Sequence, residues 1–391
     1  MPKQFSSSGY RMDGSRLIAE IGVPQEVSIL VVGDTTLPKA IPPSSVVPLL
    51  NSAKFTYAFA AGTSIYLGNR TGYKLLTSMP SEKEFVQILT DNSGIYCLHS
   101  DGLIDVFDHT GKAIWRHSSL GISTAPAILS NNQLIVTAES GIGALDIHTG
   151  KDIWFYPSLV KGISTVYDDR SNLIITALSF NTSNASDSIL SFSPSGEVRS
   201  RYRMPGMRII SNLCLCGNDK DRLAFGYIGM PNNPGEVRSL KVAIYSGLQA
   251  GKLLKTSDQS VSYLATNIAS NGPVVLSSGF EQAGGSLESG IDAFAADDST
   301  KLWERHFTRP VVTPVAISKK YAYFHLSFST EAIVPAKSIF YTLELSSGKT
   351  LAEVPLKGIR NGTASGMPLP VDKEEIILSD NTKPALYFLK P

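Results

Sequence analysis

The residues best able to do chemistry in this chain are its six histidines, its three cysteines and two pairs of adjacent aspartates. Cys214 and Cys216 lie two apart in a strand-like run, where side chains share a face but rarely form a relaxed disulfide. We expect two buried free thiols there. Asp168-Asp169 and Asp297-Asp298 are expected in turns, as solvated acids, with calcium binding as the alternative. No histidines are spaced as metal ligands, so we predict no catalytic, cofactor-binding or metal-binding residue and no cofactor.

The composition excludes several classes of partner. With 35 basic and 34 acidic residues the net charge is +1, so nucleic acid is not expected as a partner. No apolar run reaches the ~18 residues of a membrane-spanning helix. The first residues lack the apolar core of a signal peptide. We therefore expect no transmembrane segment and favour the cytoplasm, with a periplasmic or extracellular location as the alternative if the chain is already processed.

The elements that must position these residues are β-hairpins, of which residues 141–157 are the clearest example. A short apolar strand ends at Asp146, Thr149 and Gly150 make the turn, and a second strand carries Trp154. Glycine suits a turn position with positive φ. A single hairpin of this kind is marginal in water, so it must belong to a larger sheet.

The hairpin phrase recurs along the chain. Residues 102–115 and 290–303 repeat it closely, and weaker copies surround Gly72, Gly196, Gly251 and Gly348. A period of about 40–50 residues is typical of a propeller or a solenoid. Within one period, residues 123–129, 133–138, 143–147 and 151–156 read as four short strands, and no helical periodicity appears. Four strands per unit with frequent Gly, Asn, Asp and Pro turns indicate propeller blades.

The repeat predicts one all-β domain, an eight-bladed β-propeller of four-stranded antiparallel blades, over residues 13–391. Residues 1–12 are expected to be a flexible N-terminus, and the proline-rich residues 33–50 an irregular insertion. The C-terminal runs 367–371, 375–379 and 384–389 read as three strands of a blade without its fourth. Residues 16–21 read as a fourth strand alone. We therefore expect the two ends of the chain to share one blade and close the ring.

The hairpins resemble the tryptophan-docking phrase Ala-x-Asp-x-x-Thr-Gly-Lys-x-x-Trp of the PQQ-like (pyrroloquinoline quinone, quinoprotein-type) β-propeller repeat family. The matching residues are Asp108, Gly111 and Trp115 in one copy, Ala144, Asp146, Thr149, Gly150, Lys151 and Trp154 in the next, and Trp303 in a copy that loses the glycine. The resemblance implies that each tryptophan packs between neighbouring blades. It indicates the fold more specifically than it indicates an activity.

Two functional branches of that family are open. One holds quinone-dependent dehydrogenases, whose alcohol-oxidising group carries an adjacent cysteine pair that this chain lacks. The other holds non-enzymatic scaffolds of the BamB type, which are closest in size. We favour a non-catalytic scaffold that binds protein partners within a larger assembly. The alternative is an oxidoreductase that binds pyrroloquinoline quinone or another small molecule in the central funnel, although a small-molecule ligand is not the expectation.

Four longer connections in consecutive units are the predicted contact surface, namely residues 179–188, 227–240, 280–289 and 328–338. They have the same phase in the repeat, so they should emerge on one face, and loops on a rigid scaffold often carry recognition. Aromatic and methionine side chains anchor protein interfaces. The candidate partner-binding residues are Phe180, Tyr227, Met230, Phe280 and Phe328. Neutral variation in loop length and capping of each blade by its own aromatic residue are the alternatives.

Overall fold

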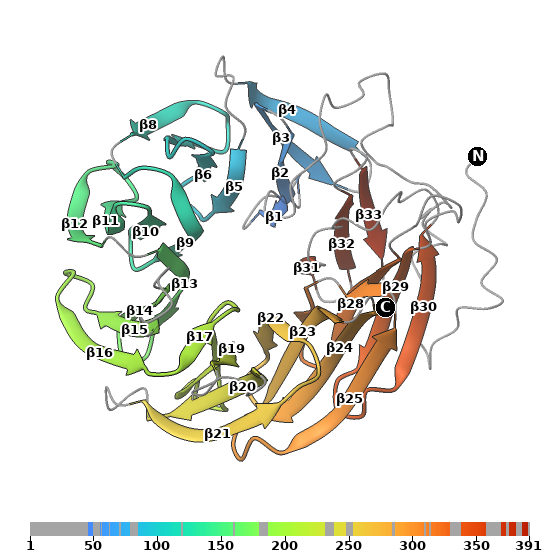
Figure 1. Ribbon diagram of the computed structural model, residues 1–391. Coiled ribbons are helices and arrows are strands. Elements are labelled where there is room, and N and C mark those ends of the chain that lie inside the picture. Colours follow the sequence, from blue (N-terminus) through green and yellow to red (C-terminus); the bar gives the residue numbers. More distant parts are fainter. Residues whose placement is uncertain are drawn as a thin grey trace, which may run out of the picture.

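The runs of apolar residues between Gly, Asn and Asp turns form β-strands in the computed structural model of the chain (Figure 1). The structure describes residues 46–389 with gaps, the longest of which are 79–84, 180–186, 231–237, 329–337 and 357–368. Within these described residues, no helix is long and apolar enough to cross a membrane. The expected flexible N-terminus, residues 1–12, and the strand expected over residues 16–21 lie outside them.

The first four blades follow one another along the chain. Their strands are β1 (Val46–Pro48), β2 (Tyr57–Ala61), β3 (Ser64–Asn69) and β4 (Gly72–Ser78); β5 (Phe85–Thr90), β6 (Ile95–His99), β7 (Ile104–Phe107) and β8 (Ala113–His117); β9 (Ser123–Ser130), β10 (Gln133–Ala138), β11 (Gly141–Asp146) and β12 (Asp152–Pro157); and β13 (Lys161–Asp168), β14 (Leu173–Ser179), β15 (Asp187–Phe192) and β16 (Val198–Met204).

The other four blades complete the disc. Their strands are β17 (Met207–Ile209), β18 (Cys214–Cys216), β19 (Arg222–Gly229), β20 (Ser239–Ser246) and β21 (Leu254–Ser260); β22 (Leu264–Ser270), β23 (Val274–Ala283), β24 (Ser286–Ala295) and β25 (Lys301–Thr308); β26 (Pro310–Val312), β27 (Ala316–Ile317), β28 (Tyr321–Phe328), β29 (Ser338–Glu344) and β30 (Thr350–Leu356); and β31 (Leu369–Asp372), β32 (Glu375–Asp380) and β33 (Ala385–Leu389). In blades 5 and 7 the first strand is split into two short pieces, both of which pair with the second strand.

The eight sheets are arranged radially around a central axis, so the predicted all-β, eight-bladed propeller is confirmed (Figure 1). Within each blade all paired strands are antiparallel, and blade 8 shows three strands among the described residues. The fourth strand that would close blade 8 was expected from residues 16–21. That part of the prediction therefore concerns residues that the structure does not describe.

The prediction that residues 33–50 form an irregular insertion is wrong for residues 46–48. Val46–Pro48 forms β1 and pairs with β2 in the register Val46 to Phe59 and Pro48 to Tyr57. A proline cannot donate to a ladder, but it is tolerated on an edge strand with one neighbour, and β1 is such an edge. The proline content of this segment therefore led to a prediction that missed the first strand of blade 1.

The core of the molecule lies between the blades. Strands β10 and β15 are buried at every position, because each blade is covered on both faces by its neighbours. The outer strand β12 alternates between exposed and half-buried residues instead. One cluster combines Ile142 of blade 3 with Leu190 and Phe192 of blade 4. Burying each such side chain contributes about 1.5–3 kcal/mol, and the ring distributes this gain over all its junctions.

A bulge recurs where the third and fourth strands pair. In blades 2 to 7 the register shifts by one residue close to the turn, as between Ala144 and Leu145 in blade 3, whereas in blade 1 the shift lies at the other end of the pair, between Ile65 and Tyr66. A bulge adds one residue to one strand and increases the local twist. It lies beside the position that holds the tryptophan in three blades, where Ala144 pairs with Trp154 and Ala293 with Trp303.

Candidate functional site

The tryptophans of the repeat join neighbouring blades. Trp115 of blade 2 donates its indole Nε1–H to the carbonyl of Ile147 in blade 3 at 2.8 Å. Trp154 of blade 3 donates to Pro194 in blade 4 at 2.9 Å, and Trp303 of blade 6 donates to the Leu345 carbonyl in blade 7 at 2.7 Å. Each half-buried indole therefore satisfies its one polar group on the next blade while its ring covers that blade's turn.

The turn under each indole requires glycine. Gly150 has a φ of 68°, and a Cβ placed on it would lie 2.6 Å from Cε3 of Trp115. Gly196 and Gly348 meet Trp154 and Trp303 in the same way, at 2.4 and 2.6 Å. In blade 2, Gly111 faces Leu76 of blade 1 in place of an indole. Both the backbone conformation and the close approach therefore exclude a side chain.

The aspartate of each phrase organises the same turn. Asp146 Oδ1 accepts hydrogen bonds from the backbone N–H groups of His148 and Thr149 and from the Thr149 hydroxyl. The Thr149 hydroxyl is the main reason that the pKa of Asp146 lies below its usual value. Asp108 is held in the same way, by Thr110 and Lys112. In blade 6 the lost glycine is replaced by Ser299, which adopts a φ of 63° and is fully buried.

One contact at these junctions was not visible in the sequence. Two residues after the tryptophan, His117 bonds through Nδ1 to the Gly150 carbonyl at 3.0 Å. Arg305, also two residues after its tryptophan, donates to the Gly348 carbonyl at 2.7 and 3.1 Å. Because alternate residues of a strand share a face, the tryptophan and this polar residue reach the same neighbouring turn. Comparison of the repeats by this spacing could have found the pair.

The junction between blades 4 and 5 is built differently. By the register of the bulge, Ser200 occupies the tryptophan position of blade 4. The neighbouring blade presents Leu253 there, and the two residues line a small apolar hollow with Ile175, Ile189 and Tyr202. The small residue, Ser200, thus lies on the outer strand of blade 4 and the large one, Leu253, on the turn of blade 5, which is the reverse of the tryptophan junctions.

The predicted partner-binding residues differ in how exposed they are in the structure. Tyr227 is only 2% exposed and packs in the cluster of Phe225 and Tyr245, so its assignment to a contact surface is wrong. It lies in β19, before the connection begins, and its position in the strand points it into the core. Met230 and Phe280 are 44% and 41% exposed. Phe180 lies outside the described residues, and Phe328 ends β28 with a side chain that the structure does not describe.

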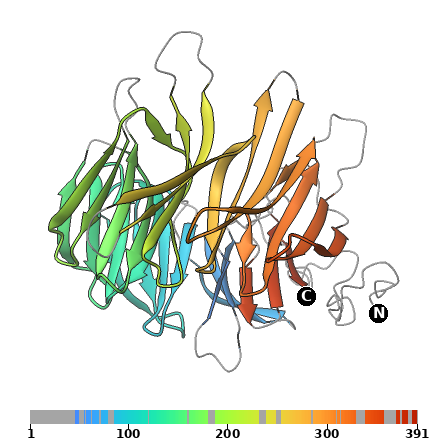
Figure 2. The ribbon, with the colours of Figure 1, turned by 90° about the horizontal axis from the view of Figure 1, so that it is seen from below.

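The expected loop over residues 280–289 is mostly strand. β23 and β24 are ten residues each and pair through Ala283 and Ser286. Their ends, residues 281–283 and 286–287, extend past β22 and β25, the strands with which they pair in the same blade, on the side of the disc that is uppermost in Figure 2. Arg238, which precedes β20 of blade 5, forms an ion pair with Glu281 of this hairpin. We call Met230, Arg238, Phe280 and Glu281 the raised rim.

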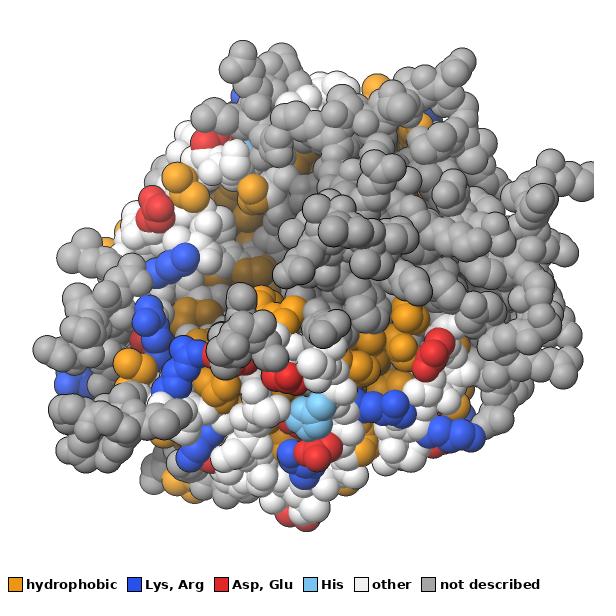
Figure 3. All heavy atoms as spheres, turned by 45° about the vertical axis from the view of Figure 1, so that its right-hand side comes forward, with side chains coloured by type: hydrophobic (Ala, Val, Ile, Leu, Met, Phe, Trp, Pro, Cys, Tyr) orange, Lys and Arg blue, Asp and Glu red, His pale blue; other side chains and the backbone are white. Residues whose placement is uncertain are grey.

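The surface around the outer strands of the later blades carries mixed charge. In Figure 3, basic and acidic side chains are interspersed with apolar and neutral polar atoms over the described residues of that face. A field of one sign, such as nucleic-acid binding requires, is not seen on the part of this face drawn in colour. The raised rim itself combines the exposed apolar side chains of Met230 and Phe280 with the ion pair between Arg238 of blade 5 and Glu281 of blade 6.

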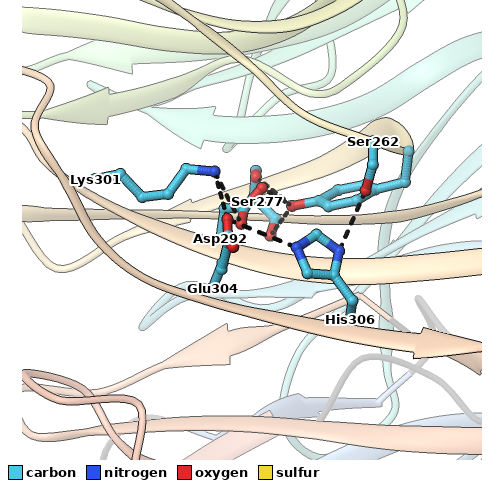
Figure 4. A network of polar contacts seen from close by, with 7 residues as sticks. Ser262, Ser277, Asp292, Lys301, Glu304 and His306 are labelled. Atoms are coloured by element: carbon cyan, nitrogen blue, oxygen red, sulfur yellow. Dashed lines mark hydrogen bonds and ion pairs between the residues drawn. The ribbon is translucent and has the colours of Figure 1, made fainter.

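A polar network crosses blade 6 (Figure 4). Asp292 of β24 is fully buried, and its Oδ2 accepts a hydrogen bond from the Tyr263 hydroxyl at 3.2 Å. Its Oδ1 lies 3.6 Å from Lys301 Nζ, which is 2.7 Å from Glu304 Oε2. His306 places Nε2 3.6 Å from Glu304 Oε2 and Nδ1 3.2 Å from Ser262 Oγ.

The electrostatics of this network follow from burial and pairing. Burial raises the pKa of Asp292, although Lys301 opposes the shift. The hydrogen bond from Lys301 lowers the pKa of Glu304. Burial on its own would lower the pKa of Lys301, but the two carboxylates raise it. The ammonium is thus the cation that balances a buried and an exposed carboxylate.

A second buried aspartate lies at the same register position in blade 2. Asp105 precedes the partner of Trp115, as Asp292 precedes the partner of Trp303. Its Oδ1 accepts from Arg116 at 2.7 Å, and its Oδ2 lies 2.9 Å from His99 Nε2. Burial would raise the pKa of Asp105, but the His99 and Arg116 bonds together lower it. Both oxygens of this carboxylate are used.

The cysteines and paired aspartates have structural roles. Cys97, Cys214 and Cys216 are free thiols, and burial raises the pKa of Cys214 to about 12. Such thiols are unreactive, because the thiolate is the nucleophile. Asp168 is buried rather than solvated and accepts a hydrogen bond from the N–H of Arg170 in its own turn.

Comparisons with known proteins place the chain among propellers by structure alone. BamB from Moraxella catarrhalis has a TM-score of 0.62 at 15% identity, with 91% of this chain and 97% of that one covered. The Dos1 propeller has a TM-score of 0.57 at 11% identity, with 93% and 96% covered. The computationally designed Ika8 protein has a TM-score of 0.59 at 11% identity, with 91% and 100% covered. No model of a protein family and no curated protein matches the sequence. At these identities the chain is similar to these proteins in its β-propeller fold.

Proposed function

We propose that this protein is a non-catalytic β-propeller of the PQQ-like repeat type that binds protein partners in a larger assembly through its raised rim. The observation that carries the proposal is the hairpin of β23 and β24, which extends past β22 and β25 and presents Phe280 at 41% exposure. Aromatic and methionine side chains are enriched in protein interfaces. The hairpin's ten-residue strands are tied to blade 5 through the ion pair of Arg238 and Glu281.

Rigidity of the rim favours this function. A surface that is already ordered loses little conformational entropy when a partner binds. Phe280 belongs to a strand paired on both sides, with Leu264 and Ser289, so its backbone is held before binding. Met230 is anchored by the hydrogen bond from its N–H to the Gly206 carbonyl at 2.8 Å. The likeness to BamB is consistent with such a scaffold in fold only.

The test is capture of partners by the double variant Met230→Ala/Phe280→Ala. The full chain is immobilised, incubated with native extract, and the bound proteins are quantified by mass spectrometry. Interface anchors typically contribute about 2 kcal/mol or more, so the captured amount of a specific partner should fall at least tenfold. The matched control is Leu302→Ala, which removes an equally exposed apolar side chain from the outer strand of the same blade.

Two outcomes would contradict the proposal. The first is capture that is equal in the double variant and the wild type. The second is an equal loss in Leu302→Ala, which would place the contact on the outer strands. Melting temperatures should agree among all three proteins, because exposed substitutions change stability by about 0.5 kcal/mol or less. A stabilising shift of several degrees with pyrroloquinoline quinone and calcium would instead favour the small-molecule alternative.

A further inference from the structure

We infer that Asp292, Glu304 and His306 form a binding site for a divalent transition-metal ion such as Zn²⁺. One possible ligand atom from each of the three side chains lies within 4.8 Å of the others. Asp292 belongs to β24, and Glu304 and His306 belong to the adjacent β25 (Figure 4). The set of two carboxylates and one imidazole is one that zinc and neighbouring metals accept.

The spacing of the ligand atoms is close to what a metal requires. In a tetrahedral site, zinc bonds of about 2.0–2.2 Å place neighbouring ligand atoms about 3.3–3.6 Å apart. His306 Nε2 and Glu304 Oε2 are 3.6 Å apart, which is longer than a hydrogen bond but suits two ligands of one ion. Glu304 and His306 side chains are 50% and 42% exposed, so a metal can enter from solvent.

The buried carboxylate supplies the independent observation. The side chain of Asp292 is completely buried, and its Oδ1 accepts no hydrogen bond but forms an ion pair with the Lys301 ammonium at 3.6 Å. A buried carboxylate oxygen without a hydrogen bond is costly. In blade 2 the equivalent Asp105 has both oxygens hydrogen-bonded by His99 and Arg116. The carboxylate at this register position is therefore fully hydrogen-bonded in blade 2, whereas in blade 6 one of its oxygens has only the ion pair with Lys301.

The imidazole is oriented as a metal ligand would be. His306 Nδ1 lies 3.2 Å from the Ser262 hydroxyl, which leaves Nε2 directed toward Glu304. Metal-bound histidines usually engage their second ring nitrogen in this way, and loss of such a partner typically lowers metal affinity about 10–100-fold. Three protein ligands would leave one coordination position for water.

Lys301 is the competing cation. Its ammonium lies 2.7 Å from Glu304 Oε2 and 3.6 Å from Asp292 Oδ1, and its side chain is 33% exposed. A metal ion would take its place between the carboxylates, and the flexible side chain would turn to solvent. If the network is only an ion-paired cluster, removal of Lys301 creates no metal site. If it is a metal site, removal of Lys301 strengthens it.

The experiment is a calorimetric titration of the metal-stripped full chain with zinc chloride. We expect one zinc ion per chain, affinity at least about tenfold weaker in His306→Gln and Ser262→Ala, and tighter binding in Lys301→Gln. His148→Gln, which changes an exposed turn histidine, is the matched control and should bind like the wild type. These substitutions are at exposed positions, whereas Asp292→Asn could impair folding.

The inference is overturned if neither the wild type nor Lys301→Gln binds one zinc ion at up to about 1 mM. It is also overturned if His306→Gln and His148→Gln have the same affinity, because the zinc would then lie elsewhere. A cobalt titration gives a second readout. Coordinated cobalt should produce visible absorption in the wild type and not in His306→Gln. This result is independent of partner capture, so failure of one proposal leaves the other standing.

Discussion

The junctions around the ring solve one packing problem in different ways. Between blades 2 and 3, 3 and 4, and 6 and 7, an indole lies on the turn of the next blade and donates to its carbonyl. Between blades 4 and 5, Ser200 takes the indole position, Leu253 fills part of the space from the other side, and a hollow remains. What the ring requires at a junction is therefore complementary volume, and the tryptophan is one means of supplying it.

The two kinds of junction also differ in the contacts that fix one blade relative to the next. A tryptophan junction carries a hydrogen bond and a ring contact from one blade to the turn of the next, so its geometry is specified at several atoms. The junction of blades 4 and 5 combines apolar contact with buried hydrogen bonds from the N–H groups of Ile209 and Leu213 to Asp187 and Ser164, and exposed ion pairs such as that of Arg170 and Asp219 lie at its edge. Exposed pairs contribute little, about 0–1 kcal/mol.

The largest expected effect comes from Trp154→Ala, which removes the indole between blades 3 and 4. Truncation of a large aromatic residue should cost about 3 kcal/mol, at the low end of the usual range because the side chain is half-buried. Urea denaturation at equilibrium measures the loss. Ile153→Ala, at 43% exposure one residue earlier, is the control, expected within about 0.5 kcal/mol of wild type. Similar losses in the two variants would contradict the role of the indole.

A smaller loss is expected for Gly150→Ala, which tests the other side of a tryptophan junction. The added Cβ meets Trp115 at 2.6 Å and must adopt a φ of 68°, so we expect a loss of about 2 kcal/mol. Gly206→Ala is a close control, since Gly206 has a φ of 70° and nothing within 4 Å of its added Cβ.

The control should cost about 1 kcal/mol from backbone strain alone. The difference between the two glycine variants then measures the contact with the indole. Equal losses in the same urea titrations would show that the glycine is needed for its backbone conformation and not for the close approach of Trp115.

The smallest expected effect is the coupling in a swap at the junction of blades 4 and 5. Ser200→Trp alone should overpack against Leu253, and Leu253→Gly alone should enlarge the hollow. The double variant recreates the arrangement of the tryptophan junctions and should be more stable than the sum of the single losses by about 1 kcal/mol. A double-mutant cycle by urea denaturation measures this term, and simple additivity would show that the two residues do not share one space.

Part of the site could be predicted from residue types alone. The phrase around Trp154 identified the turn and its glycine, because these depend on local conformation and on a repeat spaced along the chain. The interblade position of the indole was implied by the resemblance to the PQQ-like repeat family. The weak copy near Gly251 misled the alignment, since the bulge places Leu253 and not Gly251 opposite Ser200. A degraded repeat leaves the register to the strand pairing, which sequence spacing does not fix.

The exposed residues were harder to predict. Tyr227 and Phe280 are both aromatic residues near connections, yet one is 2% and the other 41% exposed. The alternation of side chains along a strand shows which residues share a face of the sheet. It does not show which of these positions a neighbouring blade covers. The polar network was also missed, because Asp292 and His306 are brought together by the pairing of β24 with β25 and not by any ligand spacing in the sequence.

By itself, the sequence determined the repeating unit, the all-β class and the docking turns, because strand alternation, glycine turns and the spacing of the tryptophans are encoded by short segments. Only the tertiary structure decided which junction exchanges its large and small residues, which aromatic side chains remain exposed, and that Asp292 keeps an oxygen without a hydrogen bond in the cluster with Glu304 and His306. These properties depend on contacts between strands and blades, where the environment of each side chain is set by residues far away in the chain.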